Sequence, residues 1–180
     1  MVVSDDLIAA LQGSAVELFQ LRQSDVSAPY ISWLSNSDVT QYLEVRFATP
    51  QVDELLSYVE HCLVSPNILL LGIRERVDGR HVGNIKVAWS PNHLVGDVGI
   101  MLGDPVNWGR GYGSQAVRLL SRFALDSLHL RKLVAGIYRS NVASVHTFCN
   151  AGFEQEAVLR GHALLDGRPE DVLLFSIFGS

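Results

Sequence analysis

The spacing of apolar and polar residues changes along the chain between the period of a helix and that of a strand. Apolar residues recur every three or four positions in two stretches, which predicts amphipathic helices over residues 50–63 and 114–128. Residues 16–21 alternate between apolar and polar, and residues 68–73 form a continuous apolar run; both patterns are typical of strands. The pattern therefore predicts a chain that mixes both kinds of element.

Turn residues and capping residues place the other elements. Ser4, Asp5 and Asp6 precede the apolar residues 7–11, and Gly13 follows, which predicts a short helix near the start. Two more helices are expected over residues 29–42 and 142–150, and further strands over residues 81–89, 94–102, 133–138, 153–165 and 172–178. The resulting order, α-β-α-α-β-β-β-α-β-α-β-β, predicts a single mixed α/β domain over residues 1–180, with helices packed around one sheet.

Composition narrows the class of protein without identifying it. A length of 180 residues favours one domain, and 48% hydrophobic against 18% charged residues disfavours disorder. A net charge of −5 argues against a nucleic-acid partner, whose binding proteins are usually basic. The longest apolar run, residues 68–73, is too short to cross a bilayer, and the acidic start lacks a secretory signal. We therefore expect a cytoplasmic protein with no membrane partner.

Histidine and cysteine spacing predicts no metal site. The six histidines show no ligand spacing, and the two cysteines, Cys62 and Cys149, form no Cys-x-x-Cys pair.

The charges are unevenly distributed along the chain. Residues 108–139 carry six basic side chains and one acidic side chain, whereas the rest of the chain carries 8 basic and 18 acidic ones. This split is consistent either with a solvated surface or with an anion site in one segment.

A glycine-rich segment lies between a predicted strand and a predicted helix. In this glycine loop (residues 107–114), Gly109, Gly111 and Gly113 occupy alternate positions, so consecutive backbone N–H groups can point into one cavity. The following helix adds its positive end, and Arg110 adds a formal charge. The spacing fits neither a Walker A loop nor a dinucleotide fingerprint. We interpret the glycine loop as a pyrophosphate cradle; a plain glycine-rich turn is the alternative.

Four blocks of the sequence, in order, resemble the GCN5-related N-acetyltransferases (GNAT), specifically the branch that acetylates the N-termini of ribosomal proteins. The glycine loop resembles the family's acetyl-CoA loop, although Trp108 stands where that loop usually has Gln or Arg. The other blocks are an N-terminal helix over residues 33–43, Val98-Gly99-Ile100 on the strand before the loop, and Asn141-Val142-Ala143-Ser144 followed by Ala151-Gly152-Phe153. The resemblance implies a GNAT-type mixed, mostly antiparallel sheet with a splayed strand pair.

The resemblance also implies acetyl-CoA as co-substrate and a set of residues that contact it. Coenzyme A would lie between the strand ending at residues 101–103 and the strand at residues 133–138. Backbone amides near Met101 and Leu102 would then polarise the thioester carbonyl, which is most effective where water is excluded. The implied contact residues are Met101, Leu102, Gly103, Trp108, Gly109, Arg110, Gly111, Tyr112, Gly113, Ser114, Asn141, Ser144 and Phe148.

The attacking amine must be neutral, so a general base is expected, acting directly or through water. Asp97 is the leading candidate because family acids often lie on this strand, although it fits equally well as the exposed residue of an alternating strand. Other acid–base residues remain open as alternatives, namely Glu154, Glu156, His162 and Asp171.

The leaving thiolate needs a proton. Many relatives supply it from a tyrosine, but this chain has Phe148 at that position. The resemblance to the ribosomal branch implies that Ser144 is the donor. Alternatively, Ser144 is a residue at the start of a helix whose side chain bonds to the backbone. Tyr138 and Cys149 are lesser candidates.

The acceptor is the least determined part of the prediction. The first 60 residues carry nine acidic and two basic side chains, which suits a cationic small-molecule or peptide amine, although solvated helix faces explain most of these acids. Segments 42–47 and 81–86 also resemble relatives that acetylate nucleotide-linked amino sugars, in which case Arg46 and Lys86 would contact the diphosphate. Phe148 keeps a third reading open, a non-catalytic acetyl-CoA-binding sensor or partner-binding domain. A homodimer is left open as the assembly.

Overall fold

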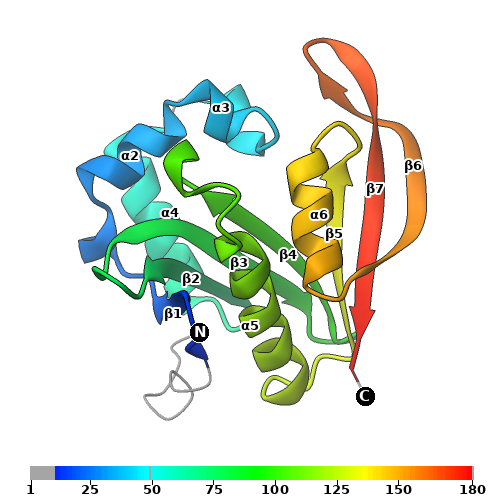
Figure 1. Cartoon of the computed structure of the whole chain (residues 1–180), viewed down its shortest axis with the longest axis horizontal. Helices are drawn as coiled ribbons and strands as arrows, with labels where there is room; N and C mark the ends of the chain where they lie inside the picture. The colour runs from blue at the N-terminus through cyan, green and yellow to red at the C-terminus, as the bar shows by residue number, and fades with distance from the viewer. Residues whose placement is uncertain (1–10, 49, 180) are drawn as a thin grey trace.

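The computed structural model describes residues 11–48 and 50–179 as one twisted sheet with helices on both faces (Figure 1). The helix predicted over residues 7–11 falls almost wholly outside the described residues. The strands are β1 (Val16–Gln20), β2 (Ile68–Glu75), β3 (His81–Ser90), β4 (Val95–Leu102), β5 (Lys132–Tyr138), β6 (Glu154–Leu165) and β7 (Arg168–Phe178). The α-helices are α2 (Ala28–Leu34), α3 (Ser37–Thr40), α4 (Val52–Val64), α5 (Tyr112–Asp126) and α6 (Val142–Asn150), with short 3-10 turns at Gln23–Asp25, Glu44–Phe47 and Pro105–Asn107.

The seven strands form one sheet in the order β1-β2-β3-β4-β5-β7-β6. All neighbouring strands are antiparallel except β4 and β5, which are parallel. The prediction of a mixed, mostly antiparallel α/β sheet is therefore confirmed. No helix among the described residues is both long enough and apolar enough to span a membrane.

Each face of the sheet has its own hydrophobic cluster. The larger cluster packs α5 and α6 onto the sheet through residues such as Leu120, Phe123 and Phe148. The smaller one packs α2 and α4 against β2 through Trp33, Leu55 and Leu70. Because the apolar stripe of each long helix faces the sheet, the 3.6-residue spacing predicted these helices correctly.

One predicted helix is divided in the structure. The stretch 29–42 forms α2 and α3, because Asn36 adopts an extended backbone between them and its side chain accepts a hydrogen bond from the Asp38 amide at 3.0 Å. Such N-capping by asparagine starts a new helix rather than continuing the old one. In the other long helix, α5 begins at Tyr112, two residues earlier than predicted, because Gly111 is its N-cap.

The two central parallel strands separate partway along their length. Only Val95–Asp97 of β4 pair with Lys132–Val134 of β5; beyond this point β4 stays paired with β3, and β5 stays paired with β7. Where the strands still pair, a Cβ on Gly96 would come within 3.0 Å of the Val87, Leu133 and Leu130 side chains, so only glycine fits. Glycine inside this strand is therefore explained by the close approach of neighbouring side chains. The separation opens the middle of the sheet.

Candidate active site

Two cavities meet where β4 and β5 separate. The first cavity, of about 690 Å³, lies on the side of α2 and α4, and the second, of about 580 Å³, lies on the side of the glycine loop. Both are lined by Tyr42, Leu43, Ile100, Met101, Asn141 and Ser144. A ligand with one end in each cavity would therefore cross the unpaired part of β4.

The glycine loop lines the second cavity and has the backbone geometry of an anion cradle. Gly109 and Gly111 have φ angles of +73° and +78°, and a Cβ on either would meet no atom within 4 Å. Their left-handed conformation, which other residues rarely adopt, turns the loop directly into the N-terminus of α5. The unpaired amides and positive end of that helix favour a negatively charged group.

The basic side chains of residues 108–139 do not converge on this cradle. Most of them are engaged elsewhere: Arg110 lies 3.7 Å from Glu75, Arg118 donates to the Asn150 carbonyl, Arg131 donates to the His93 carbonyl, Lys132 pairs with Glu156 and Arg139 pairs with Asp171. Of the described residues that line the second cavity, none is lysine or arginine. An anion site at the glycine loop would therefore depend on backbone amides rather than on the charge-rich segment as a whole.

Most residues expected to contact the co-substrate line the second cavity. They are Met101, Leu102, Trp108, Gly109, Gly111, Tyr112, Gly113, Ser114, Asn141 and Ser144. Trp108 also donates from its indole Nε1 to the Leu102 carbonyl at 3.1 Å, which fastens the glycine loop to the end of β4. Phe148 lines the first cavity instead, whereas Gly103 and Arg110 line neither. A Cβ on Gly103 would overlap the Trp33 ring, so this glycine permits close packing.

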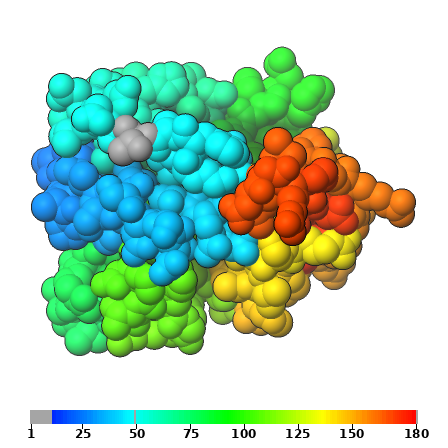
Figure 2. All heavy atoms as spheres, turned by 90° about the horizontal axis from the view of Figure 1, so that it is seen from above, coloured from blue at the N-terminus to red at the C-terminus, as the bar shows by residue number. Residues whose placement is uncertain are grey.

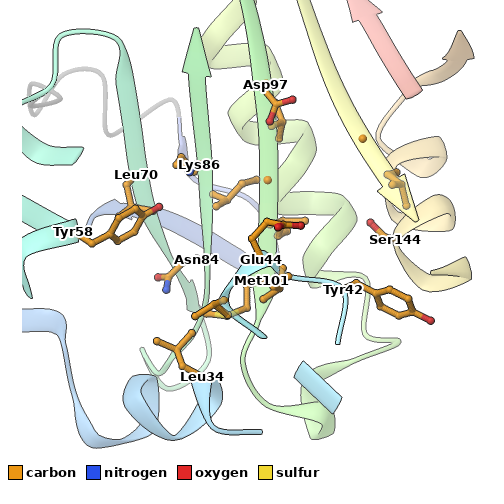
Figure 3. Close-up of a pocket in the computed structure, with 18 of the residues that line it drawn as sticks. Leu34, Tyr42, Glu44, Tyr58, Leu70, Asn84, Lys86, Asp97, Met101 and Ser144 are labelled. Carbon is orange, nitrogen blue, oxygen red and sulfur yellow. The ribbon is translucent and has the colours of Figure 1, made fainter. Parts of the chain in front are cut away.

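Asp97 lines the first cavity at the last residue of β4 that still pairs with β5. Asp97 is an exposed residue of this alternating strand, as the alternative interpretation expected. Partial shielding of its carboxyl from bulk water raises its pKa above the ordinary value, and the positive charge of Lys86 partly opposes this rise. Figure 3 shows Lys86 and Asp97 on neighbouring strands of the same cavity wall. A carboxylate with a raised pKa is a better proton acceptor near neutral pH than an ordinary one.

The other candidate bases lie outside both cavities. Among them, Glu156 pairs with Lys132 at 2.6 Å, while Asp171 pairs with Arg139 and accepts from the Gly161 amide. Glu154 and His162 likewise line neither cavity. The structure brings only Asp97 of this group to the cavity.

Ser144 lies at the junction of the two cavities, in the first turn of α6 (Figure 3). Its amide donates to the Asn141 side chain at 3.1 Å, so Asn141 caps the helix and fixes the position of Ser144. Cys149 is exposed and lines neither cavity. Tyr138 lines the first cavity, but its phenol already contacts Arg46 and Glu44.

Arg46 connects three segments around the mouth of the first cavity. Its guanidinium donates to the Tyr138 hydroxyl at 2.7 Å, to the Leu164 carbonyl at 2.9 Å and to the Leu43 carbonyl at 3.1 Å. Viewed from above, the β6–β7 hairpin therefore meets the segment around residue 46 (Figure 2). Arg46 is not a lining residue, and these internal contacts engage the guanidinium that would have met a diphosphate.

The first cavity carries more acid than base. Its charged lining residues are Glu44, Glu54 and Asp97 against Lys86 alone. Tyr30 of α2, Tyr58 of α4 and Tyr42 in the turn after α3 add aromatic surface. A cationic group with an apolar body would be stabilised by such walls. Among the described residues, no group of three or more His, Cys, Asp and Glu side chains is placed to hold a metal ion.

Sequence reasoning did not single out Asn84, Tyr58 or Glu75. Asn84 lines the first cavity and is 6% exposed; its Oδ1 faces His81 Nε2 at 2.8 Å, and its Nδ2 has no partner in the described structure. A polar residue between the buried apolar residues Val82 and Ile85 was an available signal. Glu75 gave no signal of its link to the glycine loop, because Tyr112, which donates to it, lies 37 residues away in the sequence.

The fold and the site define a class of protein: an enzyme-like α/β domain with an anion cradle on one side of a separated strand pair and an acid-lined cavity on the other. The Acetyltransferase (GNAT) domain family model matches residues 16–154. The chain therefore belongs to the GNAT acetyltransferase family, which confirms the family predicted from the sequence.

Individual relatives support the family and the fold. An "Uncharacterized N-acetyltransferase p20" from Bacillus licheniformis is 32% identical over 71 residues, covering 39% of this chain and 40% of that protein. The spermidine N-acetyltransferase from Vibrio cholerae, solved with CoA and spermine, is 18% identical with a TM-score of 0.81 over 92% of this chain and 96% of the other. A GNAT-family acetyltransferase from Bacillus anthracis has a TM-score of 0.80 at 14% identity, over 93% and 97% of the two chains.

Proposed function

We propose that this chain is an acetyl-CoA-dependent N-acetyltransferase that transfers the acetyl group to a primary amine by direct attack on the thioester. The observation that carries the proposal is the junction of the two cavities at Ile100 and Met101, on the unpaired edge of β4. An anion cradle lies on one side of this junction and a carboxylate with a raised pKa on the other. These are the two requirements of acyl transfer from a phosphorylated carrier to an amine.

The residues fit a bound coenzyme A. The glycine loop and the start of α5 offer amides to its pyrophosphate, and the edge of β4 that no longer pairs with β5 offers backbone groups to its pantetheine arm. Bound acetyl-CoA supplies the thioester that is attacked. Amides near Met101 and Leu102 would stabilise the negative charge that develops on its carbonyl oxygen.

Two side chains would move the protons. Asp97 accepts the proton of the incoming ammonium group, directly or through water, so that the amine attacks in its neutral form. Ser144, at the junction of the cavities, donates a proton to the leaving thiolate. The new amide bond forms as the carbon–sulfur bond breaks. The proton that the amine nitrogen loses in this step passes through water to Ser144 and replaces the one given to the thiolate, so the released products are the N-acetyl amine and the free thiol.

The acceptor class follows from the walls of the first cavity. Three carboxylates and the tyrosine rings favour a cationic small-molecule or peptide amine. The solved spermidine N-acetyltransferase with this fold acts on such an amine and supports the choice by analogy. The nucleotide-linked amino sugar is less favoured because the Arg46 guanidinium is engaged within the protein.

A thiol-release assay tests the function. Purified protein with acetyl-CoA is offered spermidine, kanamycin, a seryl tetrapeptide and a nucleotide-linked 4-amino sugar, and free CoA is measured over time. We expect turnover with a cationic amine, because the first cavity is acidic. Binding of acetyl-CoA without turnover on any acceptor would favour the sensor role, and failure to bind acetyl-CoA would overturn the proposal.

Replacing Ser144 with alanine tests the proton donor. Loss of a positioned general acid is expected to lower kcat by roughly 10²-fold or more. The KM for acetyl-CoA should change little, because in the described part of the chain the Ser144 side chain does not hold the glycine loop, and the bond from its amide to Asn141 survives. Steady-state kinetics measure both quantities. Cys149→Ala on the same helix is the matched control and should behave as wild type; an unchanged kcat in Ser144→Ala would exclude this role.

A further inference from the structure

A buried carboxylate lies behind the glycine loop, on the side away from the second cavity. Glu75 is the last residue of β2, and only 5% of its surface is exposed. Its Oε2 accepts from the Arg80 guanidinium at 2.7 Å. Its Oε1 accepts from the Tyr112 hydroxyl and lies 3.7 Å from the Arg110 guanidinium. Glu75 therefore binds two residues of the glycine loop from behind.

Tyr112 links this carboxylate to the anion cradle. It is the first residue of α5, follows Gly111 directly and lines the second cavity, while its phenol reaches back to Glu75. Tyr112 is 7% exposed, so its hydroxyl is held away from competing water. In a buried setting a hydrogen bond to a charged acceptor is stronger than one between neutral groups.

The position of the loop needs such support, because its own backbone supplies little. Gly109 and Gly111 have no side chains to pack, and both adopt left-handed conformations that only neighbouring contacts can select. Gln115 anchors the other side of the same turn, where its Oε1 accepts from the Ala15 and Val16 amides at 2.8 Å each. The first turn of α5 is thus held from two directions.

We propose that Glu75 is a positioning residue for acetyl-CoA: through the Tyr112 hydroxyl and the Arg110 guanidinium it holds the glycine loop in the conformation that binds the pyrophosphate. Arg80, the nearer cation, pairs with this carboxylate and holds it in place from the β2–β3 turn. The inference rests on the proposed function only in the identity of the ligand. A preformed cradle pays less conformational entropy on binding, so loosening it weakens affinity.

Acetyl-CoA binding by isothermal calorimetry tests the proposal without any acceptor. Glu75→Gln and Tyr112→Phe should each raise the Kd for acetyl-CoA about tenfold, the effect of losing one hydrogen bond to a charged group. The double variant should bind no more weakly than the weaker single one, because both changes remove the same contact. Hydrogen exchange should show faster exchange of the amides of residues 109–114 in all three variants.

The control is Glu156→Gln. This change removes an ion pair between β6 and β5, in the half of the sheet away from β2, and the variant should bind acetyl-CoA like wild type. Folded Glu75→Gln and Tyr112→Phe variants with wild-type Kd values would overturn the proposal. If Glu75→Gln does not fold, Tyr112→Phe decides the matter, since it lacks only one hydroxyl. If wild type itself does not bind acetyl-CoA, the proposed function fails, and unchanged exchange in the loop would then overturn the role of Glu75 separately.

Discussion

Replacing Asp97 with asparagine is expected to lower kcat/KM by about 10²- to 10⁴-fold, the usual contribution of a general base, while the protein becomes slightly more stable at neutral pH. Both effects have one cause. Asp97 lies in the wall of the first cavity, where reduced contact with bulk water raises the pKa of its carboxyl. The ionised form that accepts the proton is thus the form that the folded protein disfavours.

The direction of the stability change follows from proton linkage. A carboxyl whose pKa is higher in the folded than in the unfolded state favours folding while it is protonated, below its unfolded pKa. That contribution is lost as the pH rises through the folded pKa. Above the folded pKa Asp97 is ionised in both states and opposes folding, and asparagine removes this charge. Wild-type activity should fall as the pH drops through the raised pKa, and the variant should lack this acid limb.

Thermal unfolding at pH 7 and pH–rate profiles measure the two effects. Asp171→Asn is the matched control, because hydrogen bonding by the Gly161 amide and the nearby Arg139 hold the pKa of Asp171 below its ordinary range. The ionised form of Asp171 therefore favours folding above its unfolded pKa. Replacing Asp171 with asparagine should lower the unfolding temperature without changing activity. An Asp97→Asn variant that keeps wild-type kcat/KM would exclude Asp97 as the base.

Replacing Gly99 with valine is expected to reduce acetyl transfer by about 10²-fold or more, the cost of displacing a reacting group by roughly an ångström, in a fully folded protein. Gly99 lines the first cavity between Asp97 and Met101 on β4, opposite Lys86 on β3. A Cβ added there would meet nothing within 4 Å. The valine side chain would therefore occupy the space proposed for the acceptor rather than strain the sheet.

Stability should not fall, because glycine is the less favourable residue inside a strand and valine a favourable one. Acceptor kinetics, acetyl-CoA affinity and unfolding temperature are measured together. Gly99→Ala should reduce acetyl transfer less than Gly99→Val does, and both variants should still bind acetyl-CoA. Gly96→Val is the opposite control: its side chain would overlap Val87, Leu133 and Leu130, so this variant should lose stability. Wild-type turnover in Gly99→Val would contradict the assignment of the first cavity to the acceptor.

Local patterns in the sequence specified most of the fold. The 3.6-residue spacing placed α4 and α5, and the alternating or continuous apolar runs placed the strands, because each element buries one face against the same sheet. The glycine loop was also predictable, since its left-handed positions admit little but glycine. The break at Asn36 was missed because a cap inside a helical pattern competes with the apolar spacing around it.

The composition of the site was decided by tertiary structure. The excess of basic residues in 108–139 suggested an anion site, but Arg118, Arg131 and Lys132 have partners far away in the sequence. No lysine or arginine among the described residues lines the second cavity, so the proposed cradle depends on backbone amides instead. Arg46 was expected to contact the substrate, but in the folded chain its guanidinium is bonded to Tyr138 and Leu164 instead.

Residue type and spacing thus indicate which local conformation a segment adopts, because the backbone preferences and the apolar stripe act within a few residues. They do not indicate which side chains meet across the fold. Asp97 acquires its raised pKa only when the folded chain shields its carboxyl from bulk water, and Glu75 reaches the glycine loop only when the end of β2 meets the start of α5. Burial and pairing are properties of the assembled molecule, and they decide here which charges remain open to a ligand.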